Sequence, residues 1–508
     1  MSLFMVVSQT NYHALAAATN KKALRVTENG SQQRADSVSK PSSSNRESSF
    51  GEELSEEANY FPFIKVASKI SSDKIVGICI KESNIIFLGM PDTGVYVYYE
   101  EPLKEGEDFS DLNFFREYPG LISVEVNGLK LSRDILENIE KLLPQSMRCL
   151  IVDHCTIASE DFELLADIIK KHKQLASIKI RLPKSSSDES NVVLQAIAEH
   201  SQMKFLNITL GTISREGCEY LSHVISGSAE TLEGLTLGWN DIAAGDDAES
   251  DAAYKEIMES MVKTKRLAKL EFSVISISES ASSIVFEELG GVPRLINLKI
   301  FFDSLKKHRS VKLFENMEVL RDSLQKMHDL ETLDVSSMHL AGNDMQLLMQ
   351  ATGSMPKLKI LDISGNVLDQ KSAETLSESL QEHYSVTELR ANKCSIDDEA
   401  FGGLCKHLSN TSLVNLFLSG NKIKEGAKNL PLKAMPDLAL IDFAKNDMTY
   451  EDAMAFVELT KDHLKLHIVN FNRNSGIEAM SNVEKSIKSD QLTAWKLKNR
   501  NNVSFFGL

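Results

Sequence analysis

A short pattern of apolar and polar positions recurs along the whole second half of the chain and much of the first. Apolar residues hold its first, fourth and sixth places, and a polar residue tends to hold the ninth. The clearest copies are Leu232–Ile242, Leu358–Leu368, Leu413–Ile423 and Leu438–Met448. Relaxed copies begin at Leu121, Met147, Leu175, Met203, Leu267, Leu295, Leu330, Val386 and Leu466. Thirteen copies, separated by 25 to 35 residues, predict an array of similar units.

Each unit is predicted to contain a strand followed by a helix. Alternation of apolar and polar residues in the first part of each copy is typical of a strand with one buried face. The segment after one copy, Asp369–His383, instead places Ala373, Leu376 and Leu380 at helical spacing. Thr449 and Asp452 form a capping-box pattern at the start of another helix. The ninth position, an asparagine in the clearest copies, is expected to hydrogen-bond the backbone of the neighbouring unit.

Stacking such units predicts a curved α/β solenoid. Strands stack about 4.8 Å apart, whereas helices need about 8–10 Å, so the array must bend with its strands inside. We therefore expect a horseshoe of about 13–14 repeats of ~28 residues, with a parallel sheet on the concave face and helices outside.

The ends and insertions differ from the repeats. Residues 1–60 include a polar, Ser- and Glu-rich stretch and are expected to be a disordered arm, in which Ser44 and Ser49 fit an acidic-directed kinase pattern. Residues 61–120 predict three strands, at 76–80, 85–88 and 95–99, and an N-terminal cap for a repeat domain over 121–508. Leu492, Trp495 and Leu497 suggest a closing C-terminal strand. Two insertions predict rim loops, an acidic one with Asp246, Asp247, Glu249 and Asp251 and a basic one at 304–312.

Composition and motifs narrow the class of protein. The 508 residues carry a net charge of −16, which disfavours nucleic acid as a partner, and no apolar run is long enough for a membrane helix. Six cysteines without a CxxC pair do not suggest disulfides, so we expect a cytoplasmic protein. No phosphate-binding loop, HExxH or GxSxG motif occurs. Cys149, His154 and Cys155 are close in sequence but fall on a strand and its turn. We expect no catalytic residue, metal or cofactor.

The repeats resemble the ribonuclease-inhibitor-like class of leucine-rich repeats. Segments such as ETLDVSSMHLAGNDMQLLMQ and LKILDISGN are most similar to the C-terminal sensor domain of NOD-like receptors of the neuronal-apoptosis-inhibitory-protein type. The resemblance implies a ligand-sensing or autoinhibitory role in innate immune signalling. Such receptors also carry a nucleotide-binding module, whose phosphate-binding loop this chain lacks.

Function is expected on the concave face, where another protein would be gripped. Outward positions there include aromatic and basic residues, which are common anchors of protein interfaces. The predicted partner-binding residues are Phe205, Trp239, Lys299, Phe301, Phe302, Arg390 and Phe417. We place the centre of the site at Phe301, Trp239 and Lys299. The alternative is that these aromatic residues plug the concave face against one another or against an inserted loop.

Two other functions fit a horseshoe of this kind. One is an inhibitor, or a bacterial effector, that occupies the face of a host protein. The other is a GTPase-activating protein of the Ran type, which would place the chain beside a GTPase. Proteins of that type carry an acidic C-terminal tail, whereas Lys485, Lys488, Lys496, Lys498 and Arg500 make this tail basic.

Overall fold

The computed structural model describes residues 75–81, 84–89, 97–102, 123–143, 145, 147–242, 247–302, 317–382, 385–478, 489, 492–493 and 503–507. Contacts divide the chain into Met1–Phe61 and Pro62–Leu508, and every described residue belongs to the second unit. Ser44, Ser49, Asp246 and the basic segment 304–312 lie outside the described residues. Among the helices that are described, none combines the length and hydrophobicity required to cross a bilayer.

Among the described residues, fourteen parallel strands from β4 onward form the repeat sheet of the second unit, and thirteen of them coincide with the thirteen predicted copies. These strands are β4 (Ser123–Asn127), β6 (Cys149–Asp153), β8 (Ser177–Leu182), β9 (Phe205–Leu210), β11 (Gly234–Ile242), β12 (Lys269–Ser276), β13 (Asn297–Phe302), β14 (Thr332–Asp334), β15 (Ile360–Asp362), β16 (Glu388–Arg390), β17 (Asn415–Phe417), β18 (Leu440–Asp442), β19 (Ile468–Asn470) and β20 (Ser504–Phe506). Each pairs in parallel with the next. Shorter strands β5 (Lys130–Leu131), β7 (Thr156–Ile157) and β10 (Thr212–Ile213) follow β4, β6 and β9.

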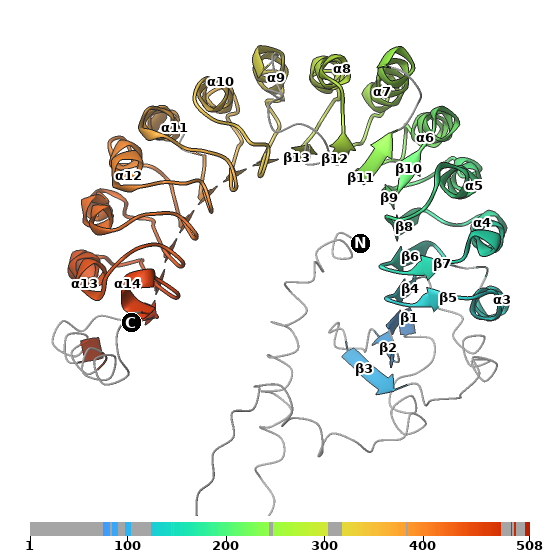
Figure 1. Ribbon diagram of the computed structural model, residues 1–508, viewed down its shortest axis with the longest axis horizontal. Helices are drawn as coiled ribbons and strands as arrows, with labels where there is room; N and C mark the ends of the chain where they lie inside the picture. Colours follow the sequence, from blue (N-terminus) through green and yellow to red (C-terminus); the bar gives the residue numbers. More distant parts are fainter. Residues whose placement is uncertain are drawn as a thin grey trace, which may run out of the picture. The chain divides into compact units, whose positions relative to one another are not determined.

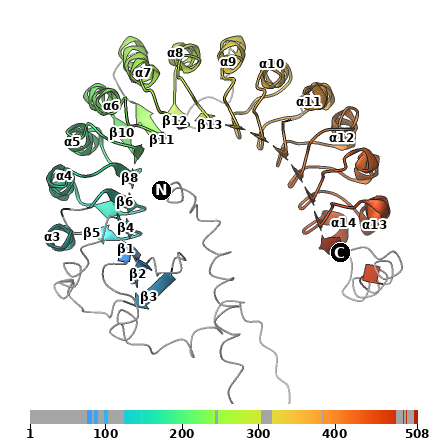
Figure 2. The same cartoon turned by 180° about the vertical axis from the view of Figure 1, so that it is seen from behind.

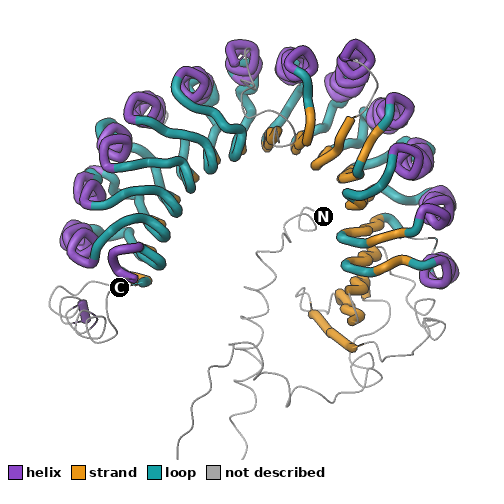
Figure 3. Tube along the Cα trace, in the orientation of Figure 1, coloured by secondary structure: helices purple, strands orange, loops and turns teal. Residues whose placement is uncertain are grey.

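Helices follow most strands and lie on the outer side of the sheet, as Figures 1 and 3 show. They are α3 (Arg133–Leu142), α4 (Phe162–Lys171), α5 (Ser187–Ala198), α6 (Arg215–Gly227), α7 (Asp247–Val262), α8 (Glu279–Leu289), α9 (Met317–Leu324), α10 (Asn343–Thr352), α11 (Gln370–Glu382), α12 (Asp398–Cys405), α13 (Tyr450–Leu459) and α14 (Ser475–Glu478). Short 3-10 turns η4 (Glu425–Asn429) and η5 (Leu432–Ala434) replace the helix between β17 and β18. The view from behind shows the same inner row of strands (Figure 2). The predicted curved α/β solenoid is confirmed.

The core lies between the sheet and the helices. One inward strand position is apolar from end to end, running through Leu333, Leu361, Leu389, Leu416 and Ile441, each 0% exposed. The predicted helical stripe Ala373, Leu376 and Leu380 faces this core. The predicted capping box of Thr449 and Asp452 begins α13.

Buried asparagines join the repeats of the C-terminal half. Asn421 Nδ2 donates to the carbonyls of Ala391 and Leu418 at 2.8 and 2.9 Å, and its Oδ1 accepts from the N–H groups of Cys394 and Ile396. Asn366, Asn446 and Asn474 bridge to the preceding repeat in the same way. At Cys155 and Cys394 the thiol takes this place and donates to Val126 O and Ile363 O. The expected bonding role of the ninth position is confirmed at these repeats.

The region before the first repeat contains β1 (Ile75–Lys81), β2 (Asn84–Gly89) and β3 (Val97–Pro102). β1 pairs in parallel with β4, and β2 lies antiparallel between β1 and β3. These strands therefore extend the repeat sheet beyond β4. The division of the chain at residues 60 and 120, and the capping role, stay predictions.

Two local expectations were wrong. Of the residues in the expected closing strand, Leu492 is helical, as is its neighbour Thr493, whereas Trp495 and Leu497 lie outside the described residues; the strand that pairs with β19 is β20, where Ser504 pairs with Ile468. A three-residue spacing such as that of Leu492 and Trp495 suits one face of a helix as well as a repeat. The second correction concerns Asp247, Glu249 and Asp251, which begin helix α7 rather than a loop. Carboxylates in a first turn are favoured by the helix dipole, and Asp251 also accepts from Ser278 Oγ and Ser280 Oγ.

Candidate functional site: the concave face

The concave face consists of two rows of outward residues. Parallel pairing keeps equivalent positions of successive repeats side by side, about 4.8 Å apart. We call the row through the third repeat position the outer row and the row through the fifth position the central row. The outer row runs through Ser177, Phe205, Gly234, Lys269, Asn297, Thr332, Ile360, Glu388, Asn415, Leu440, Ile468 and Ser504. The central row runs through Lys179, Asn207, Thr236, Glu271, Lys299, Asp334, Asp362, Arg390, Phe417, Asp442, Asn470 and Phe506.

Four of the predicted partner-binding residues belong to these rows, Phe205 to the outer row and Lys299, Arg390 and Phe417 to the central row, whereas Phe301, Trp239 and Phe302 hold the seventh and eighth repeat positions beside them. Phe205 begins β9 and is half-buried, whereas Phe301 is half-buried opposite Ser273 of β12. Trp239 belongs to β11 and Phe302 to β13, but their side chains are outside the described part of the structure. The proposed centre at Phe301, Trp239 and Lys299 therefore stays a prediction.

Lys299 is held by carboxylates of the two neighbouring strands. Its Nζ lies 3.4 Å from Glu271 Oε1 and 3.7 Å from Asp334 Oδ2. The side chain is 41% exposed, so these pairs are screened by water and contribute little stability. They do neutralise the charge of Lys299, and two carboxylates around one ammonium leave this part of the face acidic.

Arg390 is held in a similar arrangement and also contacts an aromatic ring. Its Nη2 lies 2.5 Å from Glu388 Oε1, and its Nη1 lies 3.8 Å from Asp362 Oδ2. The guanidinium carbon lies 5.9 Å from the centre of the Phe417 ring on the next strand, within the range of a cation–π contact. Arg390 and Phe417 thus form a connected pair on β16 and β17.

Two aspartates of the central row lie in a partly desolvated environment. Burial raises the pKa of Asp362, and the neighbouring carboxylate of Asp334 adds to the increase although Arg390 opposes it. Burial also raises the pKa of Asp442, against hydrogen bonds from the Ala444 N–H and from Asn470. Neighbouring groups thus compensate the charge of these carboxylates only in part.

Apolar residues also emerge on this face near its C-terminal end, and the sequence analysis missed them. Leu440 is half-buried, Ile468 is 36% exposed and Phe506 is 48% exposed. Leu440 and Ile468 hold the third repeat position, which faces outward. Their apolar character at that position would have allowed this exposed surface to be predicted from the sequence. Phe506 could not be found because the last strand was placed too early in the chain.

The thiols are poorly suited to nucleophilic chemistry. Burial raises the pKa of Cys218, Cys394 and Cys405 to about 12 in each case. Burial also raises the pKa of Cys149 and Cys155. His154 Nδ1 lies 2.9 Å from Asp153 Oδ1. Since a thiolate is the reactive form, these described cysteines are expected to be inert at neutral pH.

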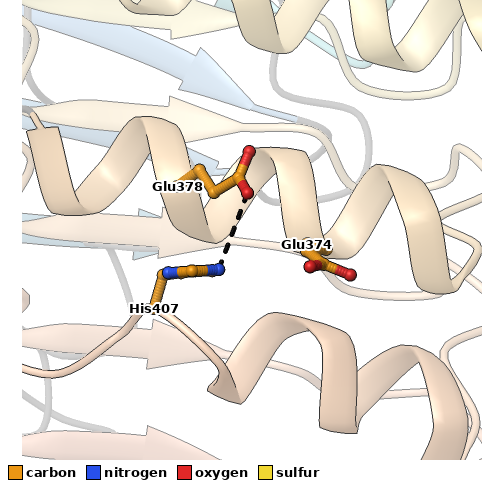
Figure 4. Close-up of side chains that lie close together, drawn as sticks. All are labelled: Glu374, Glu378 and His407. Carbon is orange, nitrogen blue, oxygen red and sulfur yellow. Dashed lines mark ion pairs between the residues drawn. The ribbon is translucent and has the colours of Figure 1, made fainter.

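One cluster on the convex side has metal-ligand chemistry. Glu374 and Glu378 project from successive turns of α11 toward His407, which follows α12 (Figure 4). His407 Nε2 lies 3.6 Å from Glu378 Oε1, and Lys406 Nζ lies 2.5 Å from Glu374 Oε1. Each carboxylate already lies beside a basic side chain of the next repeat, Lys406 or His407, so contacts between repeats account for the cluster.

No protein-family model matches the sequence. A human protein, NACHT, LRR and PYD domains-containing protein 13, is 23% identical over 252 residues. The match covers 48% of this chain and 22% of the human protein, so the chain spans only a small part of that relative. The structure itself has repeated strand-and-helix units, buried asparagines that join them and a core lined by leucines. This is a leucine-rich-repeat solenoid.

Solved structures similar to this leucine-rich-repeat solenoid include an internalin (InlF) from Listeria monocytogenes. It has a TM-score of 0.34 and 15% identity, covering 70% of this chain and 84% of that chain. The yeast Rad7 and Elc1 complex has a TM-score of 0.31 and 13% identity, covering 62% of this chain and 84% of that chain. The TLR13–ssRNA13 complex has a TM-score of 0.29 and 13% identity, covering 72% of this chain and 59% of that chain.

Proposed function

We propose that this chain is a non-catalytic scaffold that binds another protein on its concave face, as a ligand-sensing or autoinhibitory leucine-rich-repeat domain of innate immune signalling in the cytoplasm. The observation that supports binding is the sheet of fourteen parallel strands, which presents two continuous rows of side chains. Repeat proteins bind their ligands through such extended surfaces because the buried side chains of each repeat pack against the neighbouring repeats, which leaves the outward side chains for binding. Support for the immune role is the similarity to the human NACHT, LRR and PYD domains-containing protein 13.

The experiment is affinity capture with the full chain and concave-face variants. The substitutions Phe301→Ala and Phe417→Ala remove aromatic side chains from the middle and from the C-terminal part of the face. We expect at least one of them to release a captured protein that Leu464→Ala retains, since Leu464 is 93% exposed and is not part of either row. A captured protein insensitive to every concave substitution would contradict the proposal.

The same material separates the alternatives. Capture of a single enzyme whose activity falls on binding would favour an inhibitor or effector. Acceleration of GTP hydrolysis by a small GTPase would favour the GTPase-activating function instead.

A further inference from the structure

The last four strands of the sheet bring apolar side chains together around one carboxylate. Asp442 lies between Phe417 and Asn470 in the central row, and Leu440 precedes it by two residues on the same face of β18. Ile468 lies beside Leu440, and Phe506 lies beside Asn470. We call Phe417, Leu440, Ile468 and Phe506, together with Asp442, the C-terminal patch.

Two apolar side chains of the C-terminal patch are exposed to solvent and are not part of the buried core. Among the large hydrophobic side chains of the described residues, Ile468 and Phe506 are two of the five that are exposed. Both are on the same face as Phe417 and Leu440, on successive strands. An apolar surface gathered at one place, rather than scattered, is typical of a contact surface.

Asp442 gives this surface a charge preference. Among the described residues, no lysine or arginine nitrogen lies within 4.0 Å of its carboxylate, although such pairs hold Lys299 and Arg390 elsewhere on the face. Burial raises the pKa of Asp442 even though hydrogen bonds from Ala444 and Asn470 and the positive charge of Lys445 act to lower it, so its ionised form is under-solvated. Asp362, three strands away, does have such a partner, since Arg390 Nη1 lies 3.8 Å from its Oδ2. A cation brought by a partner would relieve this deficit.

We propose that the C-terminal patch binds a protein segment that sets an arginine or lysine against Asp442 and apolar side chains against Phe417, Ile468 and Phe506. This deepens the proposed function and rests on it, since it names the place on the concave face and the chemistry of the partner. Arg390 has a positioning role, because its contact with Phe417 and its pairing with Glu388 fix one wall of the patch. Cation–carboxylate pairing beside apolar contacts is a common basis of specificity at protein interfaces.

The test is selection of a phage-displayed random peptide library on the immobilised full chain. We expect enriched peptides to combine arginine or lysine with aromatic or aliphatic residues. The affinity of a synthetic copy of the best peptide should fall about tenfold or more with Asp442→Asn, the cost of losing one charge-assisted hydrogen bond. It should also weaken at higher salt. Asn retains an oxygen that can accept from the Ala444 N–H, so this variant is expected to fold; circular dichroism checks this.

Matched variants separate the possible outcomes. Ile468→Asn should also abolish binding, whereas Val367→Asn, which alters a 44% exposed apolar side chain that belongs to neither row, should leave it unchanged. Binding lost with Phe205→Ala or Phe301→Ala but not with the patch variants would overturn the patch and keep the proposed function. Peptides that are acidic or uncharged would overturn the charge assignment. Binding insensitive to every concave substitution would overturn both, and concentration-dependent dimers abolished by Ile468→Asn would show that a second copy occupies the patch instead.

Discussion

The side chain of Asn421 accepts a hydrogen bond from the backbone N–H of Cys394, the equivalent residue of the preceding repeat, at 2.8 Å. Three further bonds, one from Ile396 N–H and two to carbonyl groups, complete the set. Every polar atom of this buried amide is thus used to join two neighbouring turns of the chain.

Asn421→Ala is therefore expected to destabilise the solenoid by about 2–4 kcal/mol, because it leaves buried backbone groups unpaired. Denaturant unfolding followed by circular dichroism measures the change. Asn429→Ala is the control, since Asn429 is exposed at the end of η4. Equal stability of the two variants would argue against a joining role for the asparagine.

Adjacent glycines of α12 provide a second, matched prediction. A Cβ at Gly403 would lie 2.6 Å from the carbonyl oxygen of Gln370 on α11, whereas a Cβ at Gly402 would meet nothing within 4 Å. Gly403→Ala should destabilise the fold by about 1–3 kcal/mol through overpacking. Gly402→Ala should stabilise it by up to ~1 kcal/mol through helix propensity. Thermal unfolding of the pair checks the opposite signs; a shift of the same sign in both would show that close approach of α11 and α12 is not what selects glycine here.

Cysteine labelling gives a third prediction. The pKa of Cys218, Cys394 and Cys405 is about 12, so the reactive thiolate is scarce at neutral pH. Peptide-resolved mass spectrometry should find them unmodified by iodoacetamide in the native chain and fully modified in guanidinium. Because the pKa is raised by folding, the neutral thiols favour the folded state most below the ordinary thiol pKa. That stability is lost as pH rises from about 8.5 toward 12. Rapid labelling of the native chain would contradict the burial of these side chains.

Asp442 should respond to pH in the opposite sense to Asp329. Burial raises the pKa of Asp442, so its ionised form opposes folding at neutral pH. Asp442→Asn should therefore leave the fold equally or more stable at pH 7, and this gain should vanish well below pH ~4, where the aspartate is protonated in both states. Urea unfolding across pH measures the trend.

Asp329 is the control for that trend. A hydrogen bond from Lys357 lowers the pKa of Asp329. Its stabilisation is present above the unfolded pKa and fades as pH falls, so Asp329→Asn should lose stability at pH 7. Parallel pH profiles for the two variants would contradict the assignment.

Local patterns allowed most of the fold to be predicted. The position of each repeat strand follows from spacing within a few residues of chain, as at Leu358, Leu361 and Ile363, which are all fully buried. The bonding partners of Asn366 follow from the same short pattern. Where the pattern fits two structures equally, as around Leu492, the prediction was wrong.

The concave face was harder to predict because its contacts join residues a whole repeat apart. Lys299 looks like a free cation in sequence, yet Glu271 and Asp334 on the adjacent strands pair with it. The exposure of Ile468 depends on its neighbouring strand, since β20 pairs with one edge of β19 and leaves the concave face of β19 open. Predicting such contacts requires the register between neighbouring strands, and the alternation of apolar and polar residues along a single strand does not give that register.

The register of the sheet also sets the distance between successive side chains along the inner surface. The fourteen strands present one side chain of each row at every step of about 4.8 Å. A helix laid across them would offer a side chain on one face at every turn, about 5.4 Å, whereas residues on one face of an extended chain recur at ~6.8 Å. The spacing of side chains along the inner surface is therefore matched more closely, over several strands, by a helical ligand than by an extended one.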